Sequence, residues 1–256
     1  MKLILAILAT LAVTCDYASA TTNFCDASLC SGAQHIGCNN KGNWASTCTQ
    51  ASLVPLTEDQ RNLIVNAHNK YRNVVAGGET KLNAACRMAT MQWDEELATL
   101  AALNVKQCQM NHDACHNTES FLYSGQNLAW FGFTGTGDNS KLAEQSVDLW
   151  YGEIKDTAVS HVAKYPNGYS GPTIGHFTVL AADKNTHVGC AVANYIEKGQ
   201  TYNSFLMACN YATTNMVNFP IYESCATPAS KCTTGTNPSY KNLCSTKESY
   251  SVNKWF

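Results

Sequence analysis

Cysteine is the residue type with the most chemistry to offer in this chain, which contains thirteen of them. Cys15 lies in a predicted export signal, and removal of that signal leaves twelve cysteines. An even number of cysteines in an exported chain predicts a disulfide framework formed in an oxidising compartment. A zinc cage is the weaker alternative, because no two cysteines are spaced C-x-x-C and they are spread along the whole chain.

Nucleophilic catalysis finds little support in the remaining reactive residues. No G-x-S-x-G motif occurs, and Ser124 beside Gly125 is more typical of a turn. A cysteine nucleophile needs a free thiol, and twelve paired cysteines leave none. We therefore predict no catalytic serine or cysteine.

The predicted export signal covers residues 1–20. Lys2 supplies a positive charge, Leu3 to Val13 is almost entirely apolar, and Ala18-Ser19-Ala20 offers a cleavage site. The apolar run is too short to span a bilayer, and no other stretch approaches that length. We expect a secreted, extracellular protein without a membrane span. An N-terminal core helix is the alternative, which the specific order of the three regions disfavours.

Charge and length narrow the classes of partner. The formal net charge is −2 and only 14% of residues are charged, with no basic cluster. This composition argues against binding to nucleic acid or to an anionic membrane surface. The chain is long enough for one sizeable core with small appendages.

Three amphipathic helices are predicted, each with apolar residues three or four positions apart. The first has Thr57 as its N-cap, with Gln60 completing a capping box, and it ends at Gly77-Gly78. The second begins near Asp94, and the third covers about residues 141–156. One face of each helix is expected to pack on a core.

A β-hairpin is predicted near the end of the central region, with strands 188–196 and 202–211. With its turn centred on residues 197–200, Cys190 lies opposite Cys209. Directly opposed strand residues lie roughly 4.5–5.5 Å apart at Cα, within reach of a disulfide. The register and the Cys190–Cys209 bridge therefore support each other.

The other segments are less regular. Residues 175–181 alternate in side-chain type and predict a strand, while 131–140 predict a glycine-rich loop. Residues 21–56 form a cysteine-rich N-terminal segment without a sustained period, and 219–256 a cysteine-containing C-terminal extension. The main domain is accordingly placed at residues 57–218.

Several short motifs in residues 57–215 together resemble one family, that of cysteine-rich secretory proteins, antigen 5 and plant pathogenesis-related proteins. The N-terminal cysteines and the segment from Cys108 to Cys115 resemble its antigen 5 branch of insect venom and saliva, which includes allergens. The resemblance implies an α+β fold, a three-layer α-β-α sandwich with a central antiparallel sheet. The matching segments are Gly175-His176-Phe177-Thr178 with Val188-Gly189-Cys190, Cys209-Asn210-Tyr211, His68-Asn69-Lys70-Tyr71-Arg72, Gly125-Gln126-Asn127-Leu128-Ala129 and Trp150-Tyr151-Gly152-Glu153.

The resemblance also implies a disulfide pattern, although four cysteines lie outside it. For those four we expect a local bridge, Cys232–Cys244, and the remaining pair, Cys86–Cys225. The implied bridges are Cys25–Cys38, Cys30–Cys115, Cys48–Cys108 and Cys190–Cys209. The chain departs from the family at Ala182, where tryptophan is usual, and at Thr213, Asn215 and Met216. Ala182 is expected to open space beside the strand.

The family's central cleft gathers two histidines and two acidic residues, which match His112, position 126, Glu153 and His176. Position 126 is Gln126 here, so one carboxylate is missing. His112, Glu153 and His176 form a plausible ligand set for weakly bound zinc or another divalent cation. The alternative is that His176 is a strand histidine satisfied by hydrogen bonds. The other five histidines are taken as structural or surface residues: His35, His68, His116, His161 and His187.

The favoured function is therefore binding without catalysis, by a protein that is a monomer and requires no cofactor. The resemblance implies a small hydrophobic molecule such as a lipid, or an extracellular host protein, as the partner. A metal-dependent hydrolase or redox enzyme built on the cleft is the alternative, but Gln126 cannot act as a base because an amide does not take up a proton near neutral pH. A surface that blocks receptors or channels is a third possibility.

Overall fold

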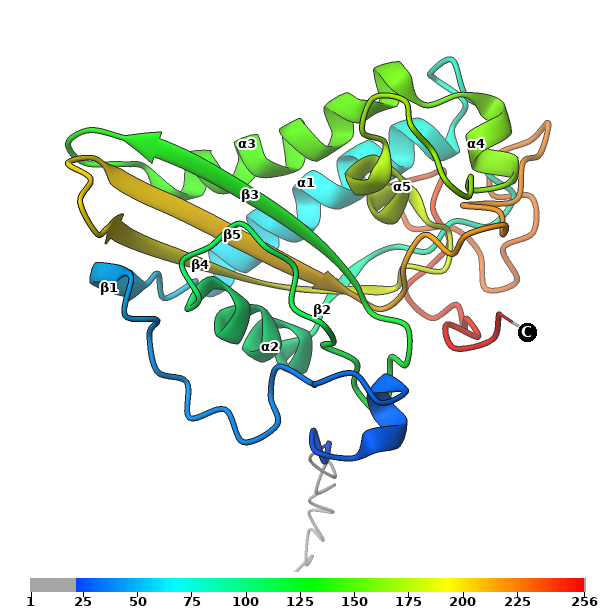
Figure 1. Cartoon of the computed structure of the whole chain (residues 1–256). Coiled ribbons are helices and arrows are strands. Elements are labelled where there is room, and N and C mark those ends of the chain that lie inside the picture. Colours follow the sequence, from blue (N-terminus) through cyan, green and yellow to red (C-terminus); the bar gives the residue numbers. More distant parts are fainter. Residues whose placement is uncertain (1–21, 256) are drawn as a thin grey trace, which may run out of the picture.

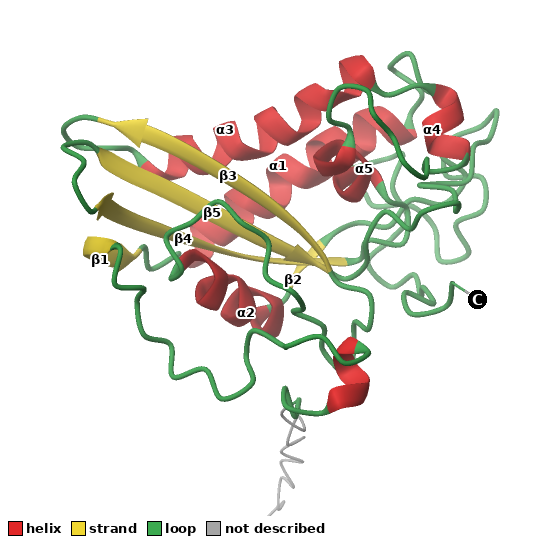
Figure 2. Ribbon diagram, in the orientation of Figure 1, coloured by secondary structure: helices red, strands yellow, loops and turns green. Residues whose placement is uncertain are grey.

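The computed structural model describes residues 22–255, so the predicted export signal and Cys15 lie outside the described residues. Helices cover both faces of one central sheet (Figures 1 and 2). In chain order the elements are η1 (Ala27–Cys30), β1 (Cys48–Leu53), α1 (Glu58–Ala76), β2 (Gln92–Trp93), α2 (Glu95–Val105), β3 (Gly125–Phe133), α3 (Asn139–Gly152), η2 (Glu153–Asp156), α4 (Val159–Ala163), α5 (Gly175–Ala181), β4 (His187–Glu197) and β5 (Asn203–Tyr211).

The sheet has the strand order β1-β4-β5-β3, antiparallel throughout, and the short β2 pairs in parallel with β4. Alternate residues of its strands enter two apolar clusters. Val192 and Met207 pack with Ile64 of α1 and Trp150 of α3, while Leu206 belongs to the cluster of α2. Because successive strand side chains point to opposite faces, the fold is the predicted α-β-α sandwich.

The predicted helix starts are confirmed by their caps. The Gln60 amide N–H donates to Thr57 Oγ1 at 3.3 Å, and the Thr57 N–H donates back to Gln60 Oε1 at 3.0 Å. The Asp94 side chain accepts from the Leu97 backbone N–H at the start of α2, and the Asp138 side chain caps α3. The third helix therefore begins two residues before the predicted position, and Glu153 belongs to the 3-10 turn that follows it.

The predicted hairpin register is confirmed, with Cys190 opposite Cys209 at a Cα separation of 4.1 Å. The glycine-rich loop prediction is wrong for residues 131–133, which belong to β3, an edge strand paired with β5. The irregular N-terminal segment likewise contains a strand, β1. Both strands depend on pairing with β4 or β5, which local sequence period does not reveal.

The strand prediction for residues 175–181 is wrong, because this segment is helix α5. Every residue from Phe177 to Ala181 is buried, so the segment lacks the exposed positions that reveal a helical period. The Thr178 hydroxyl donates to Ile174 O at 2.8 Å, four residues earlier. Ala182 caps this helix within an apolar cluster that includes Ile221, rather than lying beside a strand.

All six expected disulfides are present in the structure. Two of them, Cys30–Cys115 and Cys48–Cys108, join the N-terminal segment to the loop after α2, which contains His112. The C-terminal extension is held by Cys86–Cys225 and by an ion pair between Arg87 and Glu248, whose closest atoms lie 2.7 Å apart. None of the helices in residues 22–255 has the length and apolar character needed to span a membrane. The bridges are Cys25–Cys38, Cys30–Cys115, Cys48–Cys108, Cys86–Cys225, Cys190–Cys209 and Cys232–Cys244.

Candidate functional site

The structure brings three of the four predicted cleft residues to one cavity. His112 lies in the loop after α2, Gln126 on β3 and His176 in the first turn of α5, and all three line a cavity of about 380 Å³. Glu153, in the turn after α3, reaches His176 from the other side. Elements distant in sequence therefore converge where β3 begins and α5 starts.

Among the residues that the structure describes, each cleft histidine is hydrogen-bonded through one ring nitrogen only. His112 Nδ1 lies 2.8 Å from Gln126 Oε1, and His176 Nδ1 lies 2.6 Å from Glu153 Oε1. Since an amide oxygen and a carboxylate can only accept, each Nδ1 carries the proton and donates. In the neutral tautomer, each Nε2 therefore presents a lone pair. The His112 side chain is exposed, and that of His176 is 26% exposed.

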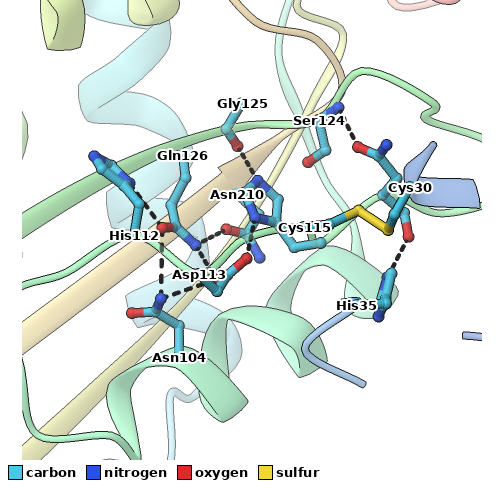
Figure 3. Close-up of polar contacts among 12 residues, drawn as sticks. Cys30, His35, Asn104, His112, Asp113, Cys115, Ser124, Gly125, Gln126 and Asn210 are labelled. Atoms are coloured by element: carbon cyan, nitrogen blue, oxygen red, sulfur yellow. Dashed lines mark hydrogen bonds and ion pairs between the residues drawn. A yellow bond between two sulfur atoms is a disulfide. The ribbon is translucent and has the colours of Figure 1, made fainter. Parts of the chain in front are cut away.

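A carboxylate that sequence reasoning missed, Asp113, lies beside Gln126 (Figure 3). Its Oδ1 accepts from His116 Nδ1 at 2.6 Å, and its Oδ2 accepts from the amides of Gln126 and Asn104 at 2.7 and 2.8 Å. Burial alone would raise the pKa of Asp113, but His116 and these amides hold it at about 2. The one local sequence feature that could have indicated this pair is the spacing of Asp113 three residues before His116.

Gln126 thus links three polar groups rather than replacing a lost base. Its Nε2 donates to Asp113 Oδ2 at 2.7 Å and to Asn210 Oδ1 at 2.9 Å, while its Oε1 accepts from His112 (Figure 3). A carboxylate at this position would lie against Asp113 without donors between them. The surrounding polar groups therefore favour an amide side chain, which can both donate and accept, over a carboxylate at position 126.

Ser124 lines the same cavity but shows no sign of nucleophilic activation. Its hydroxyl donates to Tyr211 O at 2.8 Å. His116 Nε2 instead lies 3.2 Å from Gly125 O. Within residues 22–255, no hydrogen bond joins Ser124 Oγ to a histidine, so a serine–histidine pair is not assembled there.

A second cluster resembles a metal site only in composition. In the described part of the chain, the ligand atoms of Cys30, His35 and Cys115 lie within 4.8 Å of one another, whereas those of the cleft residues do not form such a group. The two sulfurs are joined in a disulfide, and both nitrogens of His35 are hydrogen-bonded to the backbone of Gly37 and Asn117. This cluster is therefore structural.

Beside the cleft lies a wider depression of about 690 Å³, here called the α3–β3 groove, which shares His176 and Thr173 with it. The two most exposed large apolar side chains among residues 22–255 both line it. These are Leu149 of α3, 55% exposed, and Met110 of the loop after α2, 50% exposed. The cleft is thus polar and the groove beside it apolar.

The fold and these motifs define a recognised class. A model of the cysteine-rich secretory protein family, also called CAP, matches residues 65–211, and the chain belongs to this family. It is of the antigen 5 and venom allergen type. It is 42% identical over 235 residues to venom allergen-1 of Aedes albopictus, covering 90% of each chain. It is 41% identical over 187 residues to the antigen 5 like allergen Cul n 1 of Culicoides nubeculosus, covering 68% of this chain and 84% of that relative.

Among solved structures, the chain is similar to NaASP2 crystallised with Zn²⁺. The TM-score is 0.61 at 29% identity, and the match covers 74% of this chain and 97% of NaASP2. The family and the fold are therefore established by both sequence and structure.

Proposed function

We propose that this protein is a secreted antigen 5-type binding protein that holds a small apolar molecule or an extracellular host protein and does not catalyse a reaction. The observation that carries the proposal is the mutual pairing of the polar groups in the cleft. Gln126, Asp113 and His116 hydrogen-bond to one another or to the backbone. Such a network holds the shape of the cleft and leaves the adjoining apolar groove as the surface for a ligand.

The groups that could act as bases support this proposal. A general base works best when its pKa lies near the operating pH, and the pKa of Asp113 is held at about 2. Gln126 takes up no proton near neutral pH. Glu153 already accepts from His176 and from the Phe177 backbone N–H at 3.0 Å.

Secretion is supported by the six disulfides, because such bridges persist in oxidising compartments. It also agrees with the family and with relatives named as venom allergens. We expect a monomer whose partner is met outside the cell.

Divalent-metal binding in the cleft is the second candidate. It is favoured by the two Nε2 lone pairs of His112 and His176, which belong to residues lining one cavity, and by the Zn²⁺ in the NaASP2 structure. Glu153 then serves as the carboxylate that orients His176, a common arrangement around metal-binding histidines. A bound divalent cation would supply Lewis acidity, while Gln126 and Glu153 orient the two rings. We propose weak binding, with no requirement for the metal in folding.

Native mass spectrometry of the secreted protein, followed by solvent extraction, tests the main proposal. An extractable apolar molecule, with peptide and ester hydrolysis at background with and without zinc, is the expected result. Robust metal-dependent turnover that Glu153→Gln abolishes would instead establish the enzyme. Glu144→Gln is the matched control, because Glu144 is exposed on the neighbouring helix and lines neither the cleft nor the α3–β3 groove.

A further inference from the structure

The lining of the α3–β3 groove combines apolar side chains with carboxylates. Leu149, Met110 and Phe131 supply apolar surface from three different segments. Exposed apolar surface of this kind in a depression marks a binding site more often than a random patch. The volume of about 690 Å³ suits a small organic molecule.

Three carboxylates line the same groove and form what is here called the acidic rim: Asp148, Glu153 and Asp156. Lys155 is the one lysine or arginine among the groove's lining residues, and Lys81, which is not a lining residue, donates to Lys155 O. Among the lining side chains, negative charge therefore prevails. Two of the carboxylates have partners within the protein. Asp148 accepts from the Tyr71 hydroxyl at 2.5 Å, and Glu153 from His176.

Asp156 is the member of the rim without such a partner. Among residues 22–255, its carboxylate makes no hydrogen bond or ion pair, although its side chain is half-buried. A half-buried carboxylate next to apolar surface favours a cation in contact with it, because the reduced exposure to water strengthens the attraction.

We infer that the α3–β3 groove binds an amphipathic organic cation, with its apolar body on Leu149, Met110 and Phe131 and its ammonium group at Asp156. This inference rests on the proposed binding function and names the class of ligand. The charge of the rim discriminates against a fatty acid, whose carboxylate would face three carboxylates and a single lysine.

Gly152 gives direct access to the groove for a test. It is the last residue of α3, with helical backbone angles of −56° and −22°. A Cβ built at this position meets no atom within 4 Å, so a side chain there projects into open space. Gly152→Leu should therefore fill part of the groove while the protein still folds, since leucine is also a better helix former than glycine.

The experiment titrates three probes of equal chain length into the full protein by calorimetry: decylammonium, decanol and decanoate. All are used below their aggregation concentrations. Decylammonium is expected to bind about tenfold more tightly than decanoate, with decanol between them, and its advantage should shrink as salt is added.

Two variants locate the site. Gly152→Leu should weaken all three probes by about tenfold, because it removes space. Asp156→Asn should weaken decylammonium by about threefold to tenfold and leave decanol unchanged. Glu144→Gln, which removes an exposed carboxylate of α3 outside this groove, should change no probe by more than about twofold.

Each other outcome overturns the inference. Equal or tighter binding of decanoate would refute the role of the rim, and unchanged binding by Gly152→Leu would place the probes elsewhere. If no probe binds, the inference fails as well. An apolar molecule recovered by extraction from the secreted protein would in that case still support the proposed binding function, so the two can fail separately.

Discussion

The histidine in the core and the histidines in the cleft differ in how many of their ring nitrogens are hydrogen-bonded. His68, in the core on α1, is fully buried, with Nδ1 2.8 Å from Ile64 O and Nε2 2.9 Å from the Tyr211 hydroxyl. His112 and His176, in the cleft, are each held through Nδ1 alone. A histidine with both nitrogens bonded holds the fold, whereas one with a nitrogen facing a cavity can bind a ligand.

The core cluster extends along α1 to Arg72, which is also fully buried. Its guanidinium donates to Ala89 O at 2.7 Å, Leu180 O at 2.7 Å and Ala182 O at 2.8 Å. It thereby joins α1 to the end of α5, and burial lowers its pKa to about 10, still above neutral pH. The H-N-x-x-R motif is therefore a structural device here, and the following variants separate it from the cleft.

Arg72→Met should have the largest effect on stability. It leaves several buried carbonyl oxygens without their donor, and we expect a loss of about 3–5 kcal/mol in the free energy of unfolding. Denaturant unfolding with the disulfides intact measures it. Lys70→Met, an exposed lysine on the same helix, should cost below about 1 kcal/mol; similar losses in the two variants would refute the structural role.

The core histidine should make stability depend on pH. Burial lowers the pKa of His68 from 6.5 to about 4, so its stabilisation is full above pH 6.5 and is lost as the pH falls towards 4. Between pH 6.5 and 5 wild type should lose about 2 kcal/mol that His68→Gln does not lose.

The half-buried Asp183 changes stability in the opposite direction over part of this range. Burial raises the pKa of Asp183 from 3.8 to about 6, so its contribution is full below pH 3.8 and is lost as the pH rises through 6. It is present in both proteins and cancels in their difference. Parallel pH profiles for wild type and His68→Gln would show that His68 titrates normally in the folded protein.

Tyr211→Phe should have a smaller effect, about 1–2 kcal/mol. The hydroxyl donates to His68 Nε2 and accepts from Asn127 Nδ2 at 3.2 Å, so its removal leaves the buried His68 Nε2 unpaired, while Asn127 Nδ2 keeps His176 O as an acceptor at 3.0 Å. Thermal or denaturant unfolding is the measurement. Tyr169→Phe, at an exposed tyrosine, is the control and should leave the free energy of unfolding unchanged. If Tyr211→Phe also left it unchanged, the Tyr211 hydroxyl would not stabilise the core cluster.

His112→Ala should change stability least, by no more than about 0.5 kcal/mol, because its ring is exposed and bonded once. Zinc affinity, measured by calorimetry, should instead fall by about tenfold or more in both His112→Ala and His176→Ala. It should also be weaker at pH 5.5 than at 7.5, since a ligating imidazole must be neutral. The control is His161→Ala, outside the cleft, which should leave zinc affinity unchanged. Unchanged zinc affinity in both His112→Ala and His176→Ala would place the metal elsewhere.

The features predicted correctly from sequence are those with a local signal. Thr57 and Gln60 form a capping box from residues three apart, and the turn length alone aligns Cys190 with Cys209. The missed features depend on distant partners. Strand β3 is defined by its pairing with β5, and α5 is buried at every position from Phe177 to Ala181.

Motif matching named several residues of the candidate site, but it gave neither their hydrogen bonds nor Asp113. His112, Gln126 and His176 do meet at one cavity, whereas Glu153 contacts His176 rather than completing a close ligand group. Asp113 could not be predicted from motif spacing because its hydrogen bond is to Gln126, thirteen residues away on another element. Motif spacing does not reveal hydrogen bonds between different secondary-structure elements.

The two bridges that join the N-terminal segment to the loop after α2 have a consequence for the proposed ligand binding. Cys48–Cys108 and Cys30–Cys115 anchor the two ends of the short loop that carries Met110 to the groove and His112 to the cleft. Such cross-links restrict the excursions of the intervening chain. Under the proposed binding function, ligand residence time should therefore depend on a segment that lines neither the cleft nor the α3–β3 groove. A protease or reductant acting on that segment should shorten the residence time before the sheet unfolds.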